Sequence, residues 1–222
     1  MNKVFQISVD AEGIATLTID RQDNAMNVID QLFMDELAAA AGIDPVAFRL
    51  AHVKDTRERA VIEAVAKAAN WKPGENAAQK GNVLRGRGIG YARYKTVATY
   101  NAVIAEVEVN PRTGVVKVPR IWAAADAGQI INPDGLINQI EGGVVQSMSW
   151  TLMEQVRFDR NGILSEDWWN YPILTMPDVP KVETVLLNRP NERSLGAGEA
   201  SRGLSSICTC GVLPDWARAP CF

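Results

Sequence analysis

The sequence has very little histidine and cysteine, and this excludes several kinds of active site. His52 is the single histidine among 222 residues, so a Ser-His-Asp triad or a histidine-bound metal would have to use it. Its surroundings form a short helical pattern with no partner motif, and we interpret His52 as a structural residue. The three cysteines, Cys208, Cys210 and Cys221, match neither a zinc-ligand spacing nor a disulfide framework. The sequence therefore predicts no metal held by protein side chains.

The sequence also lacks a long apolar run and an excess of either charge. Its net charge is -3, and it is 47% hydrophobic and 22% charged, which is typical of a globular protein. No stretch approaches the ~20 apolar residues that a membrane-spanning helix requires. Residues 1–6 do not form the apolar region of a signal peptide. We expect neither a nucleic acid nor a membrane as partner, and a cytoplasmic location.

Hydrophobic periodicity predicts an α+β fold in which helices pack on a mixed sheet. Gly42 is suited to end the first helix, Asp44 and Pro45 to start the second, and Asp55 to cap the third. β character begins at Leu84. The expected segments are a hairpin over 4–20, helices over 31–41, 45–53 and 56–70, strands over 97–109 and 115–125, a helix over 134–155, a short strand pair over 156–159 and 163–164, and a strand over 182–187.

The most informative of these segments is the helix that carries two adjacent glycines between two glutamines. Gln139, Gly142, Gly143 and Gln146 recur at positions i, i+3, i+4 and i+7, which places them on one helical face. Each glycine weakens a helix by roughly 1 kcal/mol relative to alanine. A face of bare backbone between two carboxamides is suited to the close approach of a flat, polar ligand.

A glycine-rich loop later in the chain carries the second candidate site. Gly196, Ala197, Gly198 and Glu199 place one carboxylate beside backbone that can approach a ligand closely. Burial that raises the pKa of such a glutamate toward the operating pH would make it a general base. An exposed loop glutamate is an equally good interpretation of this motif by itself.

Two further motifs allow two interpretations each. Residues 85–90 read RGRGIG, which is neither a GxGxxG nor a P-loop pattern, so a glycine-tolerant strand is favoured over a phosphate loop. Residues 168–172 read WWNYP. For these aromatic side chains, packing beneath a loop is favoured over lining a pocket for a planar substrate.

Five segments together resemble the C-terminal part of the large, molybdenum-cofactor-binding subunit of the xanthine dehydrogenase/aldehyde oxidase family. The resemblance is strongest to the isoquinoline 1-oxidoreductase-like branch. The segments are FMDELA at 33–38, DPVAFRL at 44–50, AADAG at 124–128 leading to Asn132 and Pro133, NQIEGG at 138–143, and LGAGE at 195–199.

This resemblance implies an oxidoreductase that hydroxylates an aldehyde or a small aromatic heterocycle with water as the oxygen source. It implies a molybdenum-molybdopterin cofactor, in its cytosine dinucleotide form, which Gln139 contacts, and it makes Glu199 the active-site base. Gly142, Gly143 and Gly198 are expected to let the backbone come close to the cofactor. Electrons would leave through [2Fe–2S] clusters on an iron–sulfur partner subunit.

The two ends of the chain follow other patterns. Residues 1–28 are similar to the opening hairpin of crotonase enzymes but lack the oxyanion-hole segments of that family, residues 29–203 carry the molybdenum-subunit resemblance, and residues 204–222 form an irregular tail of unknown origin. The glycine-rich cofactor segments that the family has earlier in its sequence find no match in this chain. The sequence therefore predicts a fragment of a molybdenum hydroxylase. The alternatives are an inactive gene fusion or truncated remnant and, with less support, an enoyl-CoA hydratase.

Overall fold

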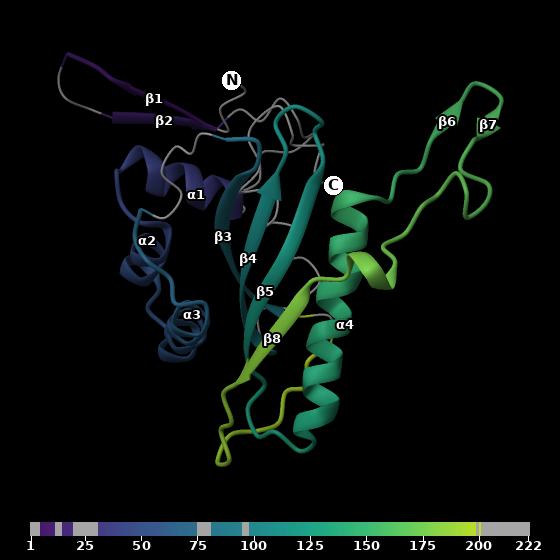
Figure 1. Ribbon diagram of the computed structural model, residues 1–222. Coiled ribbons are helices and arrows are strands. Elements are labelled where there is room, and N and C mark those ends of the chain that lie inside the picture. Colours follow the sequence, from purple (N-terminus) through teal and green to yellow (C-terminus); the bar gives the residue numbers. More distant parts are fainter. Residues whose placement is uncertain are drawn as a thin grey trace.

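The computed structural model describes residues 5–11, 15–19, 31–74, 81–94, 98–198 and 200. Helices cover both faces of a central sheet (Figure 1), which confirms the predicted α+β fold. The strands are β1 (Phe5–Val9), β2 (Ala15–Ile19), β3 (Leu84–Arg93), β4 (Tyr100–Val109), β5 (Val116–Asp126), β6 (Phe158–Asp159), β7 (Gly162–Ile163) and β8 (Lys181–Leu186). The helices are α1 (Gln31–Ala40), α2 (Pro45–His52), α3 (Thr56–Ala68), α4 (Pro133–Leu152) and the 3₁₀ turn η2 (Met176–Asp178).

The central sheet is mixed, as predicted. Its strand order is β3-β4-β5-β8, with antiparallel pairing between β3, β4 and β5 and parallel pairing between β5 and β8. A tight turn joins β4 to β5, because Asn110 Oδ1 accepts the N–H groups of Arg112 and Thr113 and Gly114 adopts a φ of 73°. Parallel strands need a long crossover. The connection that contains α4 supplies it, and this connection places α4 on one face of the sheet.

Strand β4 divides its side chains between two cores, because successive residues of a strand point to opposite faces. The core on the α4 side includes Val103, Ala105, Val107, Ile140, Val144 and Met148. The core on the α3 side includes Val61, Ile62, Val65, Ala102 and Ile104. Burying a side chain of valine or isoleucine size contributes about 1.5–3 kcal/mol, so these two cores hold the three layers together.

The three helices α1, α2 and α3 begin at the predicted residues and end one or two residues earlier than predicted. Asp44 Oδ1 accepts the backbone N–H groups of Val46 and Ala47, and Asp55 Oδ1 accepts that of Arg57 at 2.7 Å. Gly42 adopts a φ of 65° just after α1. Each side-chain cap of this kind stabilises its helix by about 1 kcal/mol. The N-cap residues Asp44 and Asp55 therefore predicted the starts of α2 and α3 correctly.

One interpretation from the sequence is wrong. Trp168 and Trp169 do not pack beneath a loop, because 75% and 94% of their surfaces are exposed. Residues 155–173 contain no buried side chain at all. The segment leaves the body of the protein after α4 and returns only at residues 174–181 (Figure 1). Within the described residues, this segment has no core beneath it on which the two rings could pack.

The strand interpretation of residues 85–90 is confirmed. They form part of β3, and two ion pairs cross to β4, one from Arg85 to Glu108 and one from Arg87 to Glu106. His52 also agrees with a structural role, since its Nδ1 lies 2.7 Å from the carbonyl oxygen of Phe48.

The hairpin over 4–20 is confirmed as the antiparallel pair β1–β2, although its crotonase-like origin stays a prediction. Glu199 and the tail over 204–222, with all three cysteines, lie outside the described residues. In the described part of the chain, no helix has the length and apolar character needed to cross a membrane. The same part holds no group of three or more His, Cys, Asp or Glu side chains that could bind a metal ion.

Candidate functional site

Helix α4 exposes three of the four residues that the sequence placed on one face. Gln139, Gly142 and Gln146 are exposed, and a Cβ atom added to Gly142 would meet no atom within 4 Å. Gly143 is buried, and the buried Ser147 hydroxyl donates to its carbonyl oxygen at 2.9 Å. The exposed stripe is therefore narrower than predicted, because its edge lies between Gly142, which is exposed, and Gly143, which faces the core.

The glycine-rich loop is held to the sheet at successive residues. The Leu195 N–H donates to the carbonyl oxygen of Ala127 at 2.8 Å, and the buried Thr99 hydroxyl donates to that of Gly196. Ala197 belongs to the core on the α4 side, and its carbonyl oxygen accepts the Ala200 N–H. The backbone on either side of position 199 is therefore fixed by the fold.

Position 198 requires glycine, because of its backbone conformation and because its surroundings leave no room for a side chain. Its φ is 52°, a left-handed value that other residues adopt only with strain. A Cβ atom at this position would lie 2.7 Å from Cε1 of the Tyr94 ring. The loop can therefore lie against Tyr94 only because this residue has no side chain.

A hydrogen bond joins the two predicted site elements. Gln139 Nε2 donates to the carbonyl oxygen of Gly198 at 2.6 Å, across a separation of 59 residues. Both residues are exposed, so their contact lies at the surface between α4 and the loop. The glutamine-glycine helix and the glycine-rich loop thus form one site, and Glu199 follows Gly198 directly in the sequence.

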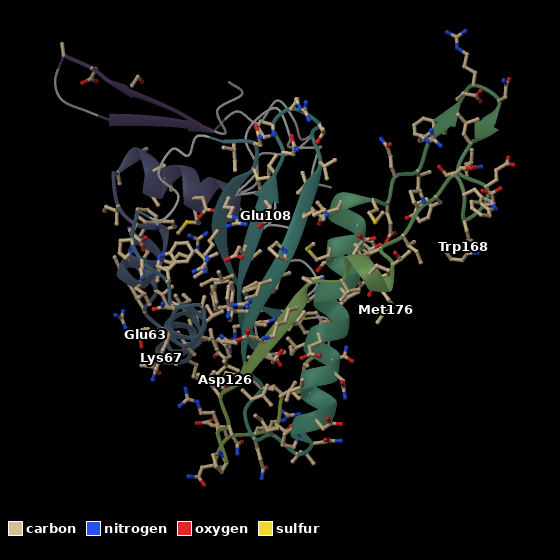
Figure 2. The ribbon with its side chains drawn as sticks, viewed as in Figure 1. Glu63, Lys67, Glu108, Asp126, Trp168 and Met176 are labelled. Atoms are coloured by element: carbon tan, nitrogen blue, oxygen red, sulfur yellow. The ribbon has the colours of Figure 1, made fainter. Side chains whose placement is uncertain are left out.

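An ion cluster fixes the end of the sheet that carries this loop, and its central residue is Asp126, which Figure 2 labels. Asp126 is fully buried at the end of β5, and Arg57 of α3 donates to both carboxylate oxygens. Arg189 Nε donates at 3.0 Å, and the Gly128 N–H donates at 3.0 Å. Burial by itself raises the pKa of Asp126, but these hydrogen bonds outweigh it and the pKa lies below its ordinary value. Asp126 is therefore a carboxylate that links a helix, a strand and the segment leading to the loop.

Gly128, two residues after Asp126, allows the end of β5 and segment 189–195 to approach each other closely. Gly128 adopts a φ of 75°, and a Cβ atom there would lie 2.0 Å from the carbonyl oxygen of Arg193. The Gly128 carbonyl oxygen accepts the Arg189 N–H at 3.0 Å. Segments 126–128 and 189–195 therefore lie in direct backbone contact. The AADAG sequence makes this contact possible, because Asp126 pairs with Arg189 and Gly128 has no side chain.

The sequence did not predict the side chains that support the glycine-rich loop. Thr99, Tyr94 and Asp126 stand far from the loop in the sequence. No local pattern indicated Thr99 or Tyr94, and Asp126 lies in the AADAG segment of the resemblance without a predicted role. Asn101, two residues after Thr99, is a separate buried polar residue that the sequence did not indicate. Among the described residues, neither atom of its amide group has a hydrogen-bond partner. The signal for Asp126 in the sequence is the AADAG segment, in which a lone acid stands inside a run of alanines.

Sequence comparisons find relatives of this chain among known proteins. The family model described as a molybdopterin cofactor-binding domain matches residues 18–180. A nicotinate dehydrogenase subunit of Pseudomonas putida is 43% identical over 82% of this chain and 16% of that protein. The beta subunit of isoquinoline 1-oxidoreductase from Brevundimonas diminuta is 33% identical over 78% of this chain and 21% of that protein. The chain thus spans about a fifth or less of the length of these relatives.

Among solved structures, quinoline 2-oxidoreductase from Pseudomonas putida 86 is similar at 27% identity and a TM-score of 0.48. That similarity covers 51% of this chain and 15% of the other.

Proposed function

Because the chain belongs to the molybdopterin cofactor-binding domain family, we propose that it forms one wall of the cofactor site of a molybdenum hydroxylase. The hydrogen bond between Gln139 and Gly198 carries this proposal, since it unites the two motifs into one surface. The proposed cofactor is molybdenum-molybdopterin in its cytosine dinucleotide form. An iron–sulfur subunit with [2Fe–2S] clusters is the proposed partner.

The exposed stripe on α4 fits a flat, polar group. Gly142 has open space where a side chain would be, and Gln139 and Gln146 present carboxamides on either side of it. Backbone without a side chain allows close approach, and carboxamides both donate and accept hydrogen bonds. We propose Gln139, Gly142 and Gly198 as the contacts. Gly143 is left out of this set because it is buried.

When bound, the cofactor supplies the two-electron redox chemistry, while the chain supplies placement and proton transfer. In the overall reaction a C–H carbon of the substrate becomes C–OH. Water provides the oxygen, and two protons and two electrons leave. The electrons go to the iron–sulfur partner. We propose that the Glu199 carboxylate accepts one of the protons. The fixed backbone of Gly196, Ala197 and Gly198 supports this role, because a general base must be held in place.

The proposed substrate is a small aromatic N-heterocycle, with an aldehyde as the second possibility. Support comes from the names of two relatives, nicotinate dehydrogenase and isoquinoline 1-oxidoreductase. A carbon next to a ring nitrogen is electron-poor, which favours attack by an oxygen nucleophile. An aldehyde oxidoreductase molybdenum-binding subunit of Escherichia coli, 28% identical to this chain, supports the second possibility.

Substitution of Gly142 by valine tests the cofactor surface. We expect molybdenum per chain to fall about tenfold or more, which corresponds to ~1.4 kcal/mol of binding free energy. Thermal stability should hold or rise, because a Cβ atom at this position meets no atom of the described residues within 4 Å and glycine is a poorer helix former than valine. The measurement is elemental analysis of the chain coexpressed with an iron–sulfur subunit in cells that make the cofactor.

Three results separate the possibilities. Molybdenum retained equally by wild type and Gly142→Val would refute contact at Gly142. A wild-type chain that holds no molybdenum would refute the enzyme and favour the inactive remnant. Loss of stability together with molybdenum would show that the substitution acts on folding.

The Glu199→Gln variant tests the proposed base. Glutamine keeps the size of the side chain but cannot accept the proton, so turnover should fall by at least about a hundredfold, the lower range for general-base catalysis. Molybdenum content should stay at the wild-type level. The readout is steady-state oxidation of nicotinate, with Glu192→Gln, a change at an exposed glutamate seven residues earlier, as the control. Turnover within a few-fold of wild type would remove Glu199 from the mechanism.

A further inference from the structure

Residues 153–178 form an arm: the chain leaves the body of the protein after α4, projects over residues 155–173 and returns to α4 at residues 174–178 (Figure 1). Its two short strands, β6 and β7, pair only with each other within the described residues. The arm nevertheless has a defined shape, because its polar groups bond locally. Ser165 Oγ accepts the Arg157 N–H at 2.9 Å, and Asp167 Oδ1 accepts the N–H groups of Trp169 and Asn170. At its base, the Tyr171 hydroxyl donates to Glu154 at 2.7 Å.

This arm exposes more large apolar side chains than any other part of the described chain. Trp169 is 94% exposed, and the labels in Figure 2 place Trp168 on the arm and Met176 near its return to α4. The exposed large apolar residues of the arm are Val156, Phe158, Ile163, Leu164, Trp168, Trp169, Ile173 and Met176. Soluble surfaces do not gather apolar groups in this way unless another surface covers them.

We propose that the arm is an interface for the remainder of a molybdenum large subunit, the portion of the relatives that this chain does not match. The matched family domain includes the arm, yet the nicotinate dehydrogenase relative from Pseudomonas putida has only 16% of its length in the matched part. Most of that polypeptide is therefore available to cover an arm at this position. The proposal rests on family membership and does not depend on the proposed reaction.

The net negative charge of the arm favours some binding surfaces over others. Residues 153–178 contain five acidic and two basic residues. Two such arms would repel each other, which argues against a second copy of this chain, and the same charge opposes an anionic membrane surface. The surface that fits is an apolar pocket with lysine or arginine at its rim. Tryptophan side chains seated in such pockets are the residues that most often dominate binding.

The test is capture of a defined partner. The full 222-residue chain, carrying an affinity tag, is coexpressed with the nicotinate dehydrogenase relative from Pseudomonas putida from which the matching segment has been deleted. We expect the wild-type chain to retain this partner and the double variant Trp168→Ser/Trp169→Ser to retain at least tenfold less. The control is Val115→Ser, because Val115 is an exposed apolar residue, at 51%, in the β4–β5 turn.

Circular dichroism and thermal melts of the three chains should agree, since neither tryptophan is buried. Equal capture by the wild-type and double-variant chains would overturn the proposal, as would no capture by wild type. Self-association of the wild-type chain that the double substitution abolishes would also overturn it, in favour of a second copy. Capture is read without cofactor or turnover, so it can fail while the proposed reaction stands.

Discussion

Replacing Asp126 with alanine is expected to lower the free energy of unfolding by about 3 kcal/mol. Removing one partner of a buried ion pair leaves the other charge without compensation, and this costs about 3–5 kcal/mol. The lower end applies because the side chains of Arg57 and Arg189 keep 20% and 37% of their surfaces exposed and can regain water. For a chain of this size the melting temperature should fall by about 6–12 °C. Urea denaturation followed by circular dichroism measures the change.

The matched control is Glu183→Ala on the neighbouring strand. Glu183 also pairs with cations, Lys181 at 3.1 Å and Arg120 at 3.8 Å, but all three side chains are at least 39% exposed. Exposed pairs contribute up to about 1 kcal/mol. If both variants lost the same small amount of stability, Asp126 would be only another surface charge, and its role in holding the loop would be refuted.

The pH dependence tests the same cluster independently. The pKa of Asp126 in the folded chain is lowered, so it lies below that of an unfolded aspartate, roughly 3.9. Its contribution to stability is therefore complete above about pH 4 and is lost as the pH falls through the folded-state pKa. The gap between wild type and Asp126→Ala should stay constant from roughly pH 6 to 8 and narrow below about pH 4. A gap that widened in acid would contradict this sign.

Local signals in the sequence carry most of the fold. Asp44 and Asp55 act on N–H groups two or three residues away, so their caps could be predicted from spacing alone. The same holds for the β4–β5 turn around Asn110. The prediction that the aromatic side chains of residues 168–172 are packed was wrong, because burial depends on what surrounds a segment and not on the segment itself. Nothing within residues 168–172 says that the chain beside them leaves the core.

The candidate site divides in the same way. Helical spacing correctly placed Gln139, Gly142 and Gln146 on one exposed stripe, and it misplaced Gly143 because the edge of the stripe depends on how α4 is rotated against the sheet. The supports of the loop were not predictable. Arg57 and Asp126 are 69 residues apart, and their pairing exists only once α3 and β5 have packed on each other.

Replacing Gly128 with alanine is expected to separate segment 189–195 from the end of β5. The new Cβ atom would lie 2.0 Å from the carbonyl oxygen of Arg193, and real contacts of this kind do not fall below 3.0 Å. The backbone must therefore shift by about 1 Å, and forcing extra volume into a packed site costs typically 1–3 kcal/mol. Left-handed backbone at an alanine adds about 1–2 kcal/mol. We expect a total loss of about 3 kcal/mol in denaturation experiments.

Gly114→Ala is a control that separates these two causes. Gly114 has nearly the same φ, 73°, but a Cβ atom there would meet nothing within 4 Å. Gly114→Ala should therefore lower the free energy of unfolding only by the cost of left-handed backbone at an alanine, about 1–2 kcal/mol. In hydrogen exchange, the Leu195 amide, which bonds to Ala127, should exchange faster in Gly128→Ala than in Gly114→Ala, while core amides of β4 change little. Equal destabilisation and equal exchange in the two variants would show that the chain tolerates a side chain at position 128. The fixed backbone beside Glu199 would then need another explanation.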